Sequence, residues 1–455
     1  MAALPVAVIG AGWAGCAAAV TLAKAGMPVT LYEAAATLGG RARRVERSGL
    51  VLDNGQHLLL GAYACSRALM QLVHDAAGTR PELTRRPLTM VPLSPTQQDA
   101  LTLQGRVAPG RLGMFLGLLL ARGLTFSERI ANLAWLSRLQ REQFARPPQE
   151  TVAAMLAPLP PRVAKGLWEP LCIAAMNTPV AAASAQIFAN VLAAAFTGPP
   201  QASDFLIPAT DLSALFPDPA ARYVIQHGGT VRTGVSARVV QSGHDGVMLA
   251  AGASAQPARA VVVAVGPHQL RSAFAPEMLA AQPALDAFLD QMQTLTYEPI
   301  VTIWLGYGAA TRLPASIARL DDAPGQWVVD RPDIVARTHS RNEGAQVAQV
   351  LAVIVSAGGP HNELDTGALA HAADAQLRRL QPALPARVWS QVITEKRATY
   401  ACTPRRVRPA GSRLTHGIYL AGDYVDADFP ATLEAAARSG TLAAEALLAD
   451  LGGGR

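Results

Sequence analysis

Three glycines near the start of the chain have the spacing that binds the diphosphate of a dinucleotide. They belong to the G-x-G-x-x-G pattern Gly10-Ala11-Gly12-Trp13-Ala14-Gly15. The first glycine permits a tight turn, the second lets the backbone approach the diphosphate, and the third lets the following helix pack on a strand. The diphosphate is expected at the N-terminus of that helix, where free N–H groups and the helix dipole favour an anion.

An acidic residue and an arginine follow this turn at sequence spacings suited to binding a dinucleotide. Glu33 lies 18 residues after Gly15, at the end of the next predicted strand. A carboxylate there can accept hydrogen bonds from both ribose hydroxyls and repel a 2′-phosphate. In Gly39-Gly40-Arg41 the glycines bring backbone close to a ligand, and the arginine offers a fork of donors for phosphate or flavin edges. Taken alone, this first unit fits NAD as well as FAD.

A second carboxylate lies far along the chain. The predicted strand Gly417–Ala421 ends in Gly422-Asp423, and a predicted helix begins near Thr432 and Leu433. Asp423 can reach the ribityl chain and diphosphate of FAD. The helix can aim its N-terminal amides at the electron-rich edge of the flavin ring and stabilise the reduced, anionic form. Because NAD needs no such distant contact, the sequence predicts FAD.

The elements that position these residues occur at three places. Strand 5–9, helix 14–25 and strand 29–32 form a β-α-β unit, and another buried strand covers 259–265. The C-terminal strand and a helix over 432–449 complete the set. We predict an α/β fold whose Rossmann-like domain is assembled from residues 1–80, 223–272 and 396–455. A mostly helical substrate domain is expected over 81–222 and 273–395, including a helix that Thr125 and Glu128 open as a capping box.

Composition excludes several classes of protein. The 455 residues are 50% hydrophobic and 16% charged, with a net charge of +6. No basic run suggests nucleic-acid binding, and the apolar surplus suits a cavity or a membrane contact. The four cysteines are scattered without a metal or disulfide pattern, so we expect reduced thiols and a cytoplasmic location. We expect neither a signal peptide nor a membrane-spanning segment, since the longest apolar run, Leu112–Ala121, is too short.

A membrane contact is expected, if anywhere, within 111–124. The apolar run Met114–Leu120 lies between Arg111 and Arg122. It fits a buried helix, and it also fits a peripheral patch on the inner face of the membrane where a lipid substrate reaches the protein.

Several segments resemble a known group of flavoenzymes. The E-x5-GGR element and the tail GD-x8-T-L-E-A-A-x-x-S-G resemble the flavin amine oxidase and phytoene desaturase superfamily. Residues 52–63 (LDNGQHLLLGAY), the WEPLC…NTP segment over 168–179 and the tail at 422–424 resemble the hydroxysqualene dehydroxylases, also called squalene-associated FAD-dependent desaturases. The resemblance covers nearly the whole chain.

The resemblance implies contacts to FAD from five positions: Gly12, Glu33, Gly40, Arg41 and Asp423. Ala237 falls where the superfamily places a backbone contact to adenine, usually from valine, so this position departs from the pattern. The implied fold is the FAD-binding domain of the flavin amine oxidase type.

The resemblance also implies the reaction. Hydride from reduced FAD replaces the hydroxyl of hydroxysqualene, giving squalene for hopanoid synthesis. An alcohol is a poor leaving group, so a proton donor is needed, and His57 is the first candidate. A structural role for His57 is equally open. Asp426 and Asp428 are alternative donors that would need burial to stay protonated. Tyr424 and Trp168 fit a cavity lining or the core.

Three rival functions stay open. A carotenoid or phytoene desaturase would use the same fold and a similar lipid. An amine oxidase is disfavoured, because members commonly place a cage tyrosine where this chain has Thr432. A carrier of prenylated proteins without flavin would not need the glycine turn, Glu33 or Asp423. The sequence offers no site for the unknown electron donor that reduces FAD.

Overall fold

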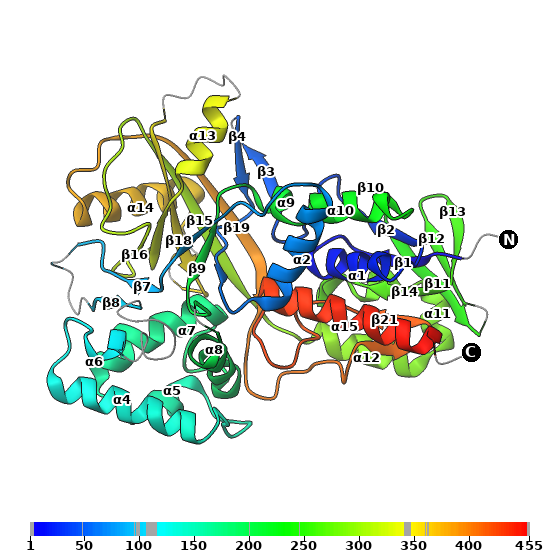
Figure 1. Ribbon diagram of the computed structural model, residues 1–455, viewed down its shortest axis with the longest axis horizontal. Coiled ribbons are helices and arrows are strands. Elements are labelled where there is room, and N and C mark those ends of the chain that lie inside the picture. The colour runs from blue at the N-terminus through cyan, green and yellow to red at the C-terminus, as the bar shows by residue number, and fades with distance from the viewer. Residues whose placement is uncertain are drawn as a thin grey trace.

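The computed structural model describes residues 4–47, 49–94, 96, 101–105, 116–199, 201–244, 246–340, 347–359, 361 and 364–452. They form two lobes, which lie on the right and left of Figure 1. The first and last elements of the chain, β1 (Val6–Ile9) and α15 (Leu433–Gly452), both belong to the right-hand lobe.

The right-hand lobe is built on a six-stranded sheet whose strands come from three distant stretches of sequence. Its order is β10-β2-β1-β14-β21-β20, and only β20 runs antiparallel to its neighbour. The other strands of this sheet are β2 (Val29–Glu33), β10 (Thr230–Thr233), β14 (Ala260–Val263), β21 (Ile418–Leu420) and β20 (Arg413–Thr415). Every residue of β1, β14 and β21 is buried, as expected for strands covered on both faces.

Two helices from opposite ends of the chain pack closely on this sheet. Helix α1 (Trp13–Lys24) lies against α15. A Cβ atom added to Gly440 of α15 would lie 2.1 Å from the carbonyl oxygen of Ala14, so the contact requires glycine. Helix α10 (Pro217–Gln226) also packs on α1, and the predicted domain boundary after residue 222 falls inside it.

The left-hand lobe contains the predicted helices. They are α4 (Phe126–Arg141), α5 (Val152–Leu156), α6 (Pro161–Val163), a π-helical turn at Ala164–Trp168, α7 (Glu169–Met176) and α8 (Ala185–Thr197). The predicted capping box is present: Thr125 and Glu128 cap the start of α4 with reciprocal hydrogen bonds.

The same lobe also holds a five-stranded antiparallel sheet, which the prediction of a mostly helical domain did not include. Its order is β16-β17-β18-β15-β19. The strands are β15 (Tyr297–Tyr307), β16 (Ile317–Arg319), β17 (Trp327–Asp330), β18 (Gln349–Ser356) and β19 (Arg387–Tyr400), and α14 (Thr366–Leu380) packs on β15 and β19. Within this sheet the run 300–305, part of β15, has the apolar pattern of a buried strand in the sequence.

Smaller elements complete the two lobes and the region between them (Figure 1). They are β3 (Arg44–Arg47), β4 (Leu50–Asp53), β5 (Leu59–Leu60), α2 (Ala64–Ala76), β6 (Leu83–Arg86), β7 (Thr89–Met90), β8 (Leu103–Gln104), β9 (Phe205–Pro208), α9 (Leu212–Leu215), β11 (Ala237–Gly243), β12 (Gly246–Ala251), β13 (Ser254–Ala258), α11 (Pro276–Ala281), α12 (Pro283–Gln293) and α13 (Pro332–Ser340), with 3₁₀ turns at Pro267–Gln269 and Arg271–Ala273.

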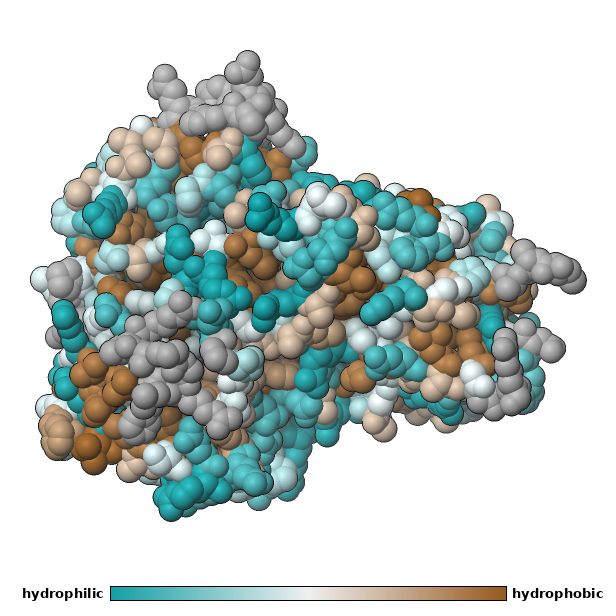
Figure 2. All heavy atoms as spheres, in the orientation of Figure 1, coloured by the Kyte–Doolittle hydropathy of each residue, from teal (hydrophilic) through white to brown (hydrophobic). Residues whose placement is uncertain are grey.

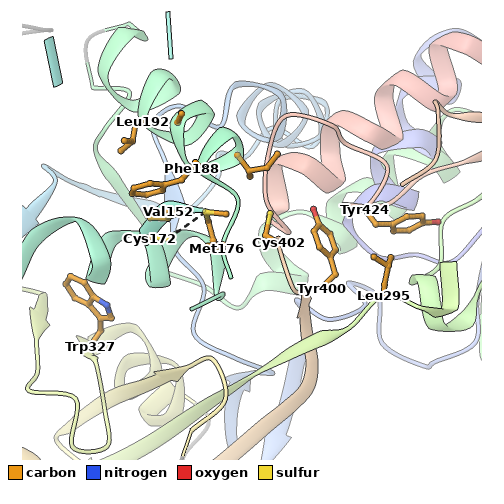
Figure 3. Packing of buried hydrophobic residues seen from close by; sticks show 14 of the residues in the cluster. Val152, Cys172, Met176, Phe188, Leu192, Leu295, Trp327, Tyr400, Cys402 and Tyr424 are labelled. Atoms are coloured by element: carbon orange, nitrogen blue, oxygen red, sulfur yellow. Dashed lines mark hydrogen bonds between the residues drawn. The ribbon is translucent and has the colours of Figure 1, made fainter. Parts of the chain in front are cut away.

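One hydrophobic cluster continues from the helices into the C-terminal tail. Figure 3 shows Cys172, Met176 and Phe188 of α7 and α8, then Tyr400 at the end of β19 with Cys402 just after it, and Tyr424 beyond them. The four cysteines are unpaired. Among the described helices, none has the length and apolar character needed to span a bilayer.

Candidate active site

The glycine turn leaves a helix N-terminus available to an anion. Gly10 has φ +97°, and a Cβ on Gly15 would lie 1.8 Å from the Gly10 carbonyl oxygen, so both positions require glycine. Gly12 is the N-cap of α1, and no described side chain caps its N–H groups. The positive end of α1 is therefore free to bind a diphosphate.

Trp13 and Ala14 can offer only their backbone groups to a ligand, because both side chains are buried. The Trp13 ring is buried against Phe216, with 5.0 Å between ring centroids. The Ala14 side chain is buried as well, and its carbonyl oxygen faces α15 at Gly440.

Glu33 and the second glycine loop close the turn from the side. Glu33 accepts hydrogen bonds from the backbone N–H groups of Ala11 (2.7 Å) and Ala35 (2.8 Å), which fix its carboxylate beside the turn. Gly39 forms a parallel bridge with Gly12, and a Cβ added to Gly40 would lie 3.1 Å from the Gly12 Cα atom. Two glycine backbones thus make a cradle that a side chain would fill.

Arg41 and Asp423 meet although they lie 382 positions apart in sequence. Arg41 Nη2 donates to Asp423 Oδ2 at 2.7 Å, and Nη1 donates to the carbonyl oxygen of Ala398 at 2.7 Å. Asp423 is 4% exposed, and its other oxygen accepts from the Tyr424 N–H. The Gly422 N–H donates to Ser439 Oγ at 2.9 Å, which ties this turn to α15. The structure thus brings together two residues that the sequence predicts to contact the cofactor.

The start of α15 is fixed by its own residues. Thr432 Oγ1 accepts from the Ala435 N–H, so Thr432 caps the helix that begins at Leu433. Glu434 is buried and accepts from the N–H groups of Cys65 and Ser66, both at 2.9 Å. Glu434 therefore caps α2 and positions the two helices together.

Ala237 lies on the Glu33 side of the cradle. It begins β11, two residues after Val235, whose N–H donates to the carbonyl oxygen of Glu33 at 2.9 Å. Its side chain is buried, so any contact to a ligand comes from its backbone.

His57 is held in one tautomer. Its Nδ1 lies 2.8 Å from the carbonyl oxygen of Gly55, which can only accept, so Nδ1 carries the proton. In the neutral ring Nε2 is then an acceptor. Burial lowers the pKa of His57, and the charges of Arg41 and Arg331 lower it further, against the opposing effect of the Gly55 hydrogen bond. The surroundings thus favour a neutral imidazole, whereas the predicted proton donor requires the imidazolium.

A buried arginine that the sequence did not reveal holds the His57 turn. Arg331 Nη1 donates to Gln56 Oε1 at 2.6 Å and lies 3.6 Å from Asp53 Oδ2. Asp333 accepts two hydrogen bonds from the same guanidinium, both at 2.8 Å.

Gln56 connects Arg331 to the turn that carries His57. Its side-chain amide donates to the His57 carbonyl oxygen at 2.9 Å, and its N–H donates to Thr302 Oγ1 at 3.1 Å. Burial raises the pKa of Asp53 to about 6 although the Arg331 charge opposes it. No local motif marks Arg331, because Gln56 lies 275 positions away. The only signal would have been a charged residue next to the apolar strand 327–329.

The alternative donors Asp426 and Asp428 have structural partners. Asp426 Oδ1 accepts from the N–H groups of Asp428 and Phe429, and Oδ2 accepts from Arg438 Nε at 2.8 Å. Asp428 is exposed and pairs with Arg438 at 3.0 Å. These contacts suit carboxylates that have no proton to donate, so they favour a structural role over the predicted one.

The aromatic candidates divide between site and core. Tyr424 lies beside Asp423, is buried, and has no hydrogen-bond partner for its Oη among the described atoms. Trp168 is a core residue of the helical lobe: Nε1 donates to Asn132 Oδ1 at 2.8 Å, and the ring packs 5.1 Å from Trp135.

A small pocket lies beside the Trp168 segment, between α7 and the β16–β17 hairpin. It has a volume of about 130 Å³ and is lined by Lys165, Glu169, Pro170, Ile173, Arg319, Asp322, Gln326 and Trp327. Ordinary small-molecule sites start at about 300 Å³. This pocket is therefore too small and too charged to hold a long isoprenoid.

Known proteins share this organisation. The chain matches a family model described as NAD(P)-binding Rossmann-like domain over residues 8–75, and one described as flavin containing amine oxidoreductase over 201–448. The hydroxysqualene dehydroxylase of Rhodopseudomonas palustris is 29% identical over 97% of this chain and 98% of its own length. The protein of the same name from Sinorhizobium fredii is 25% identical over the same shares.

The fold is also found among solved structures. An oxidoreductase from Methanosarcina mazei superposes with a TM-score of 0.72 at 16% identity, covering 98% of this chain and 100% of that one. The predicted Rossmann-like fold and the predicted resemblance to hydroxysqualene dehydroxylases are thereby confirmed. Because the second family model spans more than half of the chain, this protein belongs to the flavin-containing amine oxidoreductase family and is a flavin-dependent oxidoreductase.

Proposed function

We propose that this flavoenzyme binds FAD and removes the hydroxyl of hydroxysqualene reductively, giving squalene. The observation that carries the proposal is the end-to-end similarity to proteins named hydroxysqualene dehydroxylase. It is supported by the candidate site, where the glycine cradle and the Arg41–Asp423 pair bring together residues expected to bind FAD from the two ends of the chain.

The residues of the cradle fit the parts of FAD. The free N-terminus of α1 at Gly12 would hold the diphosphate, and Glu33 the adenosine ribose. Asp423 would accept a hydrogen bond from the ribityl chain, while Arg41 would turn part of its fork toward the diphosphate. When bound and reduced, FAD would supply the hydride that replaces the hydroxyl.

The protein's own task is to help the hydroxyl leave. In the overall change the C–O bond breaks, a C–H bond forms, and the hydroxyl departs as water after gaining one proton. His57 is the proposed contact to this hydroxyl. The Gly55 hydrogen bond and the buried Gln56–Arg331 restraint fix its ring orientation.

The pH dependence of single-turnover dehydroxylation separates two roles for His57. A donor acting as the imidazolium gives a rate that rises as the pH falls through its lowered pKa. An orienting neutral ring gives no such rise. A His57→Gln variant that binds flavin and keeps full turnover would remove His57 from the reaction altogether.

Anaerobic incubation with hydroxysqualene tests the reaction itself. The holoenzyme is reduced with dithionite and mixed with substrate, and the extracted lipid is analysed for squalene. We expect squalene in proportion to the reduced flavin, which returns to its oxidised absorption spectrum. Absence of squalene, together with activity on phytoene, would assign the chain to the carotenoid desaturases instead.

The identity and presence of the cofactor are tested separately. Flavin released by denaturation should have the mass of FAD and become more fluorescent after phosphodiesterase cleavage. A colourless protein that takes up no FAD would favour the carrier function. Oxidation of amines would favour an amine oxidase, but Thr432 caps α15 in this chain, where such enzymes commonly present a tyrosine.

A further inference from the structure

The first two turns of α4 expose apolar side chains. In the sequence Phe126, Ile130, Leu133, Leu136 and Leu139 recur at helical spacing, which predicts one apolar stripe facing the core. Leu133, Leu136 and Leu139 of the predicted stripe are buried, but Phe126 is 74% exposed and Ile130 is 46% exposed. Phe126 is the most exposed large hydrophobic residue of the described chain. The described part of the predicted contact segment 111–124 adds Leu120, which is 54% exposed, while 111–115 lie outside the described residues.

Phe126 and Ile130 are four residues apart on α4 and so share one face of the helix, and Leu120 lies six residues before Phe126. These three residues are here called the α4 patch. Figure 2 shows hydrophobic surface gathered at the lower left, over the end of α4 that begins at Phe126 in Figure 1. The other exposed large hydrophobic residues of the described chain are scattered over other elements. An apolar concentration of this kind marks an interaction surface.

The charges around the α4 patch are mostly positive. Arg122 and Arg162 are exposed, and Arg129 is partly exposed one residue before Ile130. Glu128 is the one acidic residue within 116–141, and its carboxylate accepts from the N–H and the hydroxyl of Thr125 in the capping box. The hydrogen bond with the Thr125 backbone is the main cause of the lowered pKa of Glu128, and the Arg162 charge contributes to it. The patch is thus apolar with a cationic border.

The inner face of α4 packs against the rest of the helical lobe, so the α4 patch faces solvent. Asn132 accepts a hydrogen bond from Trp168, and Trp135 packs on the same ring and donates to the Met155 carbonyl oxygen. These contacts fix the rotation of the helix, so Phe126 and Ile130 cannot turn inward.

We infer that the α4 patch inserts into the surface of an anionic phospholipid bilayer. Aromatic and aliphatic side chains with a basic border have the chemistry of an interfacial membrane contact. A protein partner fits less well, because three partly exposed side chains supply far less than the roughly 800 Å² per partner that a stable interface buries. The inference does not depend on which reaction the enzyme performs.

Vesicle flotation tests the inference. The holoenzyme is floated with vesicles of phosphatidylcholine and phosphatidylglycerol in equal parts, and with phosphatidylcholine alone. We expect binding to the mixed vesicles that weakens at high salt. Burying one large apolar side chain contributes enough that Phe126→Ser and Ile130→Ser should each lower the partition coefficient about tenfold. Arg122→Gln should lower it about fivefold on the mixed vesicles only.

Ile225→Ser is the matched control, because Ile225 is 56% exposed on α10 in the other lobe. It should bind vesicles like the parent protein. All variants should retain flavin content and unfolding temperature, since the replaced side chains are exposed. Equal binding by the parent and a Phe126→Ser/Ile130→Ser double variant would overturn the inference. So would a protein that ignores both vesicles but forms a dimer that Phe126→Ser dissociates.

Discussion

His57 illustrates how neighbours select one protonation state of a side chain. The Gly55 carbonyl oxygen fixes the proton on Nδ1, while burial and two nearby guanidinium groups oppose a second proton. A histidine pKa lowered in the folded state means that the unfolded chain binds more protons just below the ordinary pKa of 6.5. Stability must then fall as the solution is acidified.

The first prediction follows from that sign. The free energy of unfolding should decrease between about pH 7 and pH 5, and the decrease should be smaller in His57→Gln, which has nothing to protonate. Denaturant titrations at several pH values measure it. His371→Gln, at an exposed position on α14, controls for loss of an ordinary histidine. Parallel curves for the parent and His57→Gln would contradict the assignment of the neutral ring.

The second prediction concerns Asp423, the carboxylate proposed to contact FAD. Asp423→Asn should weaken flavin binding by about 10- to 100-fold, since one hydrogen bond to a charged group contributes about 1.5–3 kcal/mol. Equilibrium dialysis or flavin fluorescence gives the dissociation constant. The matched control is Asp428→Asn, which changes an exposed carboxylate bonded to Arg438. If both variants hold flavin equally well, Asp423 does not contact the cofactor.

At the scale of elements, the closest helix contact in the dinucleotide lobe joins α1 to α15. The contact depends on Gly440, whose hydrogen faces the Ala14 carbonyl oxygen. The family pattern S-G in the tail is thereby explained: Ser439 accepts from the Gly422 N–H, and Gly440 admits the other helix.

The third prediction compares two glycines of α15. Gly440→Ala should destabilise the protein by about 1–3 kcal/mol, because the added methyl group overlaps the Ala14 oxygen. Gly452→Ala has nothing within 4 Å and should be neutral or slightly stabilising through helix propensity. Thermal and denaturant unfolding measure both. A stabilised Gly440→Ala variant would mean that the helices are not packed as described.

Local patterns predicted the elements whose signals are local. The β1-α1-β2 unit, the capping box of α4 and the C-terminal strand and helix all appear where short-range spacing placed them. The five-stranded sheet was largely missed. In that sheet Ile303 pairs with Val353 and Val392, so its register is decided by contacts that no window of sequence contains. The exposed start of α4 was missed for a similar reason. Helical periodicity predicts an apolar stripe, but it does not show how much of that stripe the neighbouring elements cover.

At the scale of the molecule, the two lobes are joined by a buried charge network. Arg331, next to β17, reaches Asp53 at the end of β4, and both side chains are 1% exposed. The Arg331 guanidinium also lies over the Trp304 ring, 5.7 Å from its centroid. Charges this deeply buried are tolerated only while each partner is present.

The fourth prediction is a double-mutant cycle on this network. Arg331→Met should cost about 3–5 kcal/mol of unfolding free energy, because Asp53 and Asp333 lose their buried partner. Adding Asp53→Asn should restore part of that loss. Arg138→Met, which breaks an exposed pair with Glu142, should cost less than about 1 kcal/mol. Additive losses for Arg331 and Asp53 would show that the two do not interact.

The residues of the candidate site are also of two kinds: some belong to short sequence motifs, and others act through contacts that are distant in sequence. The glycine turn, Glu33, Arg41 and Asp423 could be selected from the sequence because each belongs to a short motif, and their contacts to FAD stay a prediction. Arg331 and Thr302, which restrain the His57 turn, could not, because they act through residues more than two hundred positions away.

The interleaved sheet also has a consequence for biosynthesis. Strand β21, the Gly422-Asp423 turn and α15 lie in the last tenth of the chain. A ribosome therefore produces the glycine turn first, and it produces Asp423 and α15, which complete the candidate site, last. Until α15 emerges, the face of α1 that it will cover stays exposed to water or to chaperones. Under the proposed contact of Asp423 with FAD, uptake of the yellow cofactor would report that translation has passed residue 423, and a prematurely terminated chain would remain colourless.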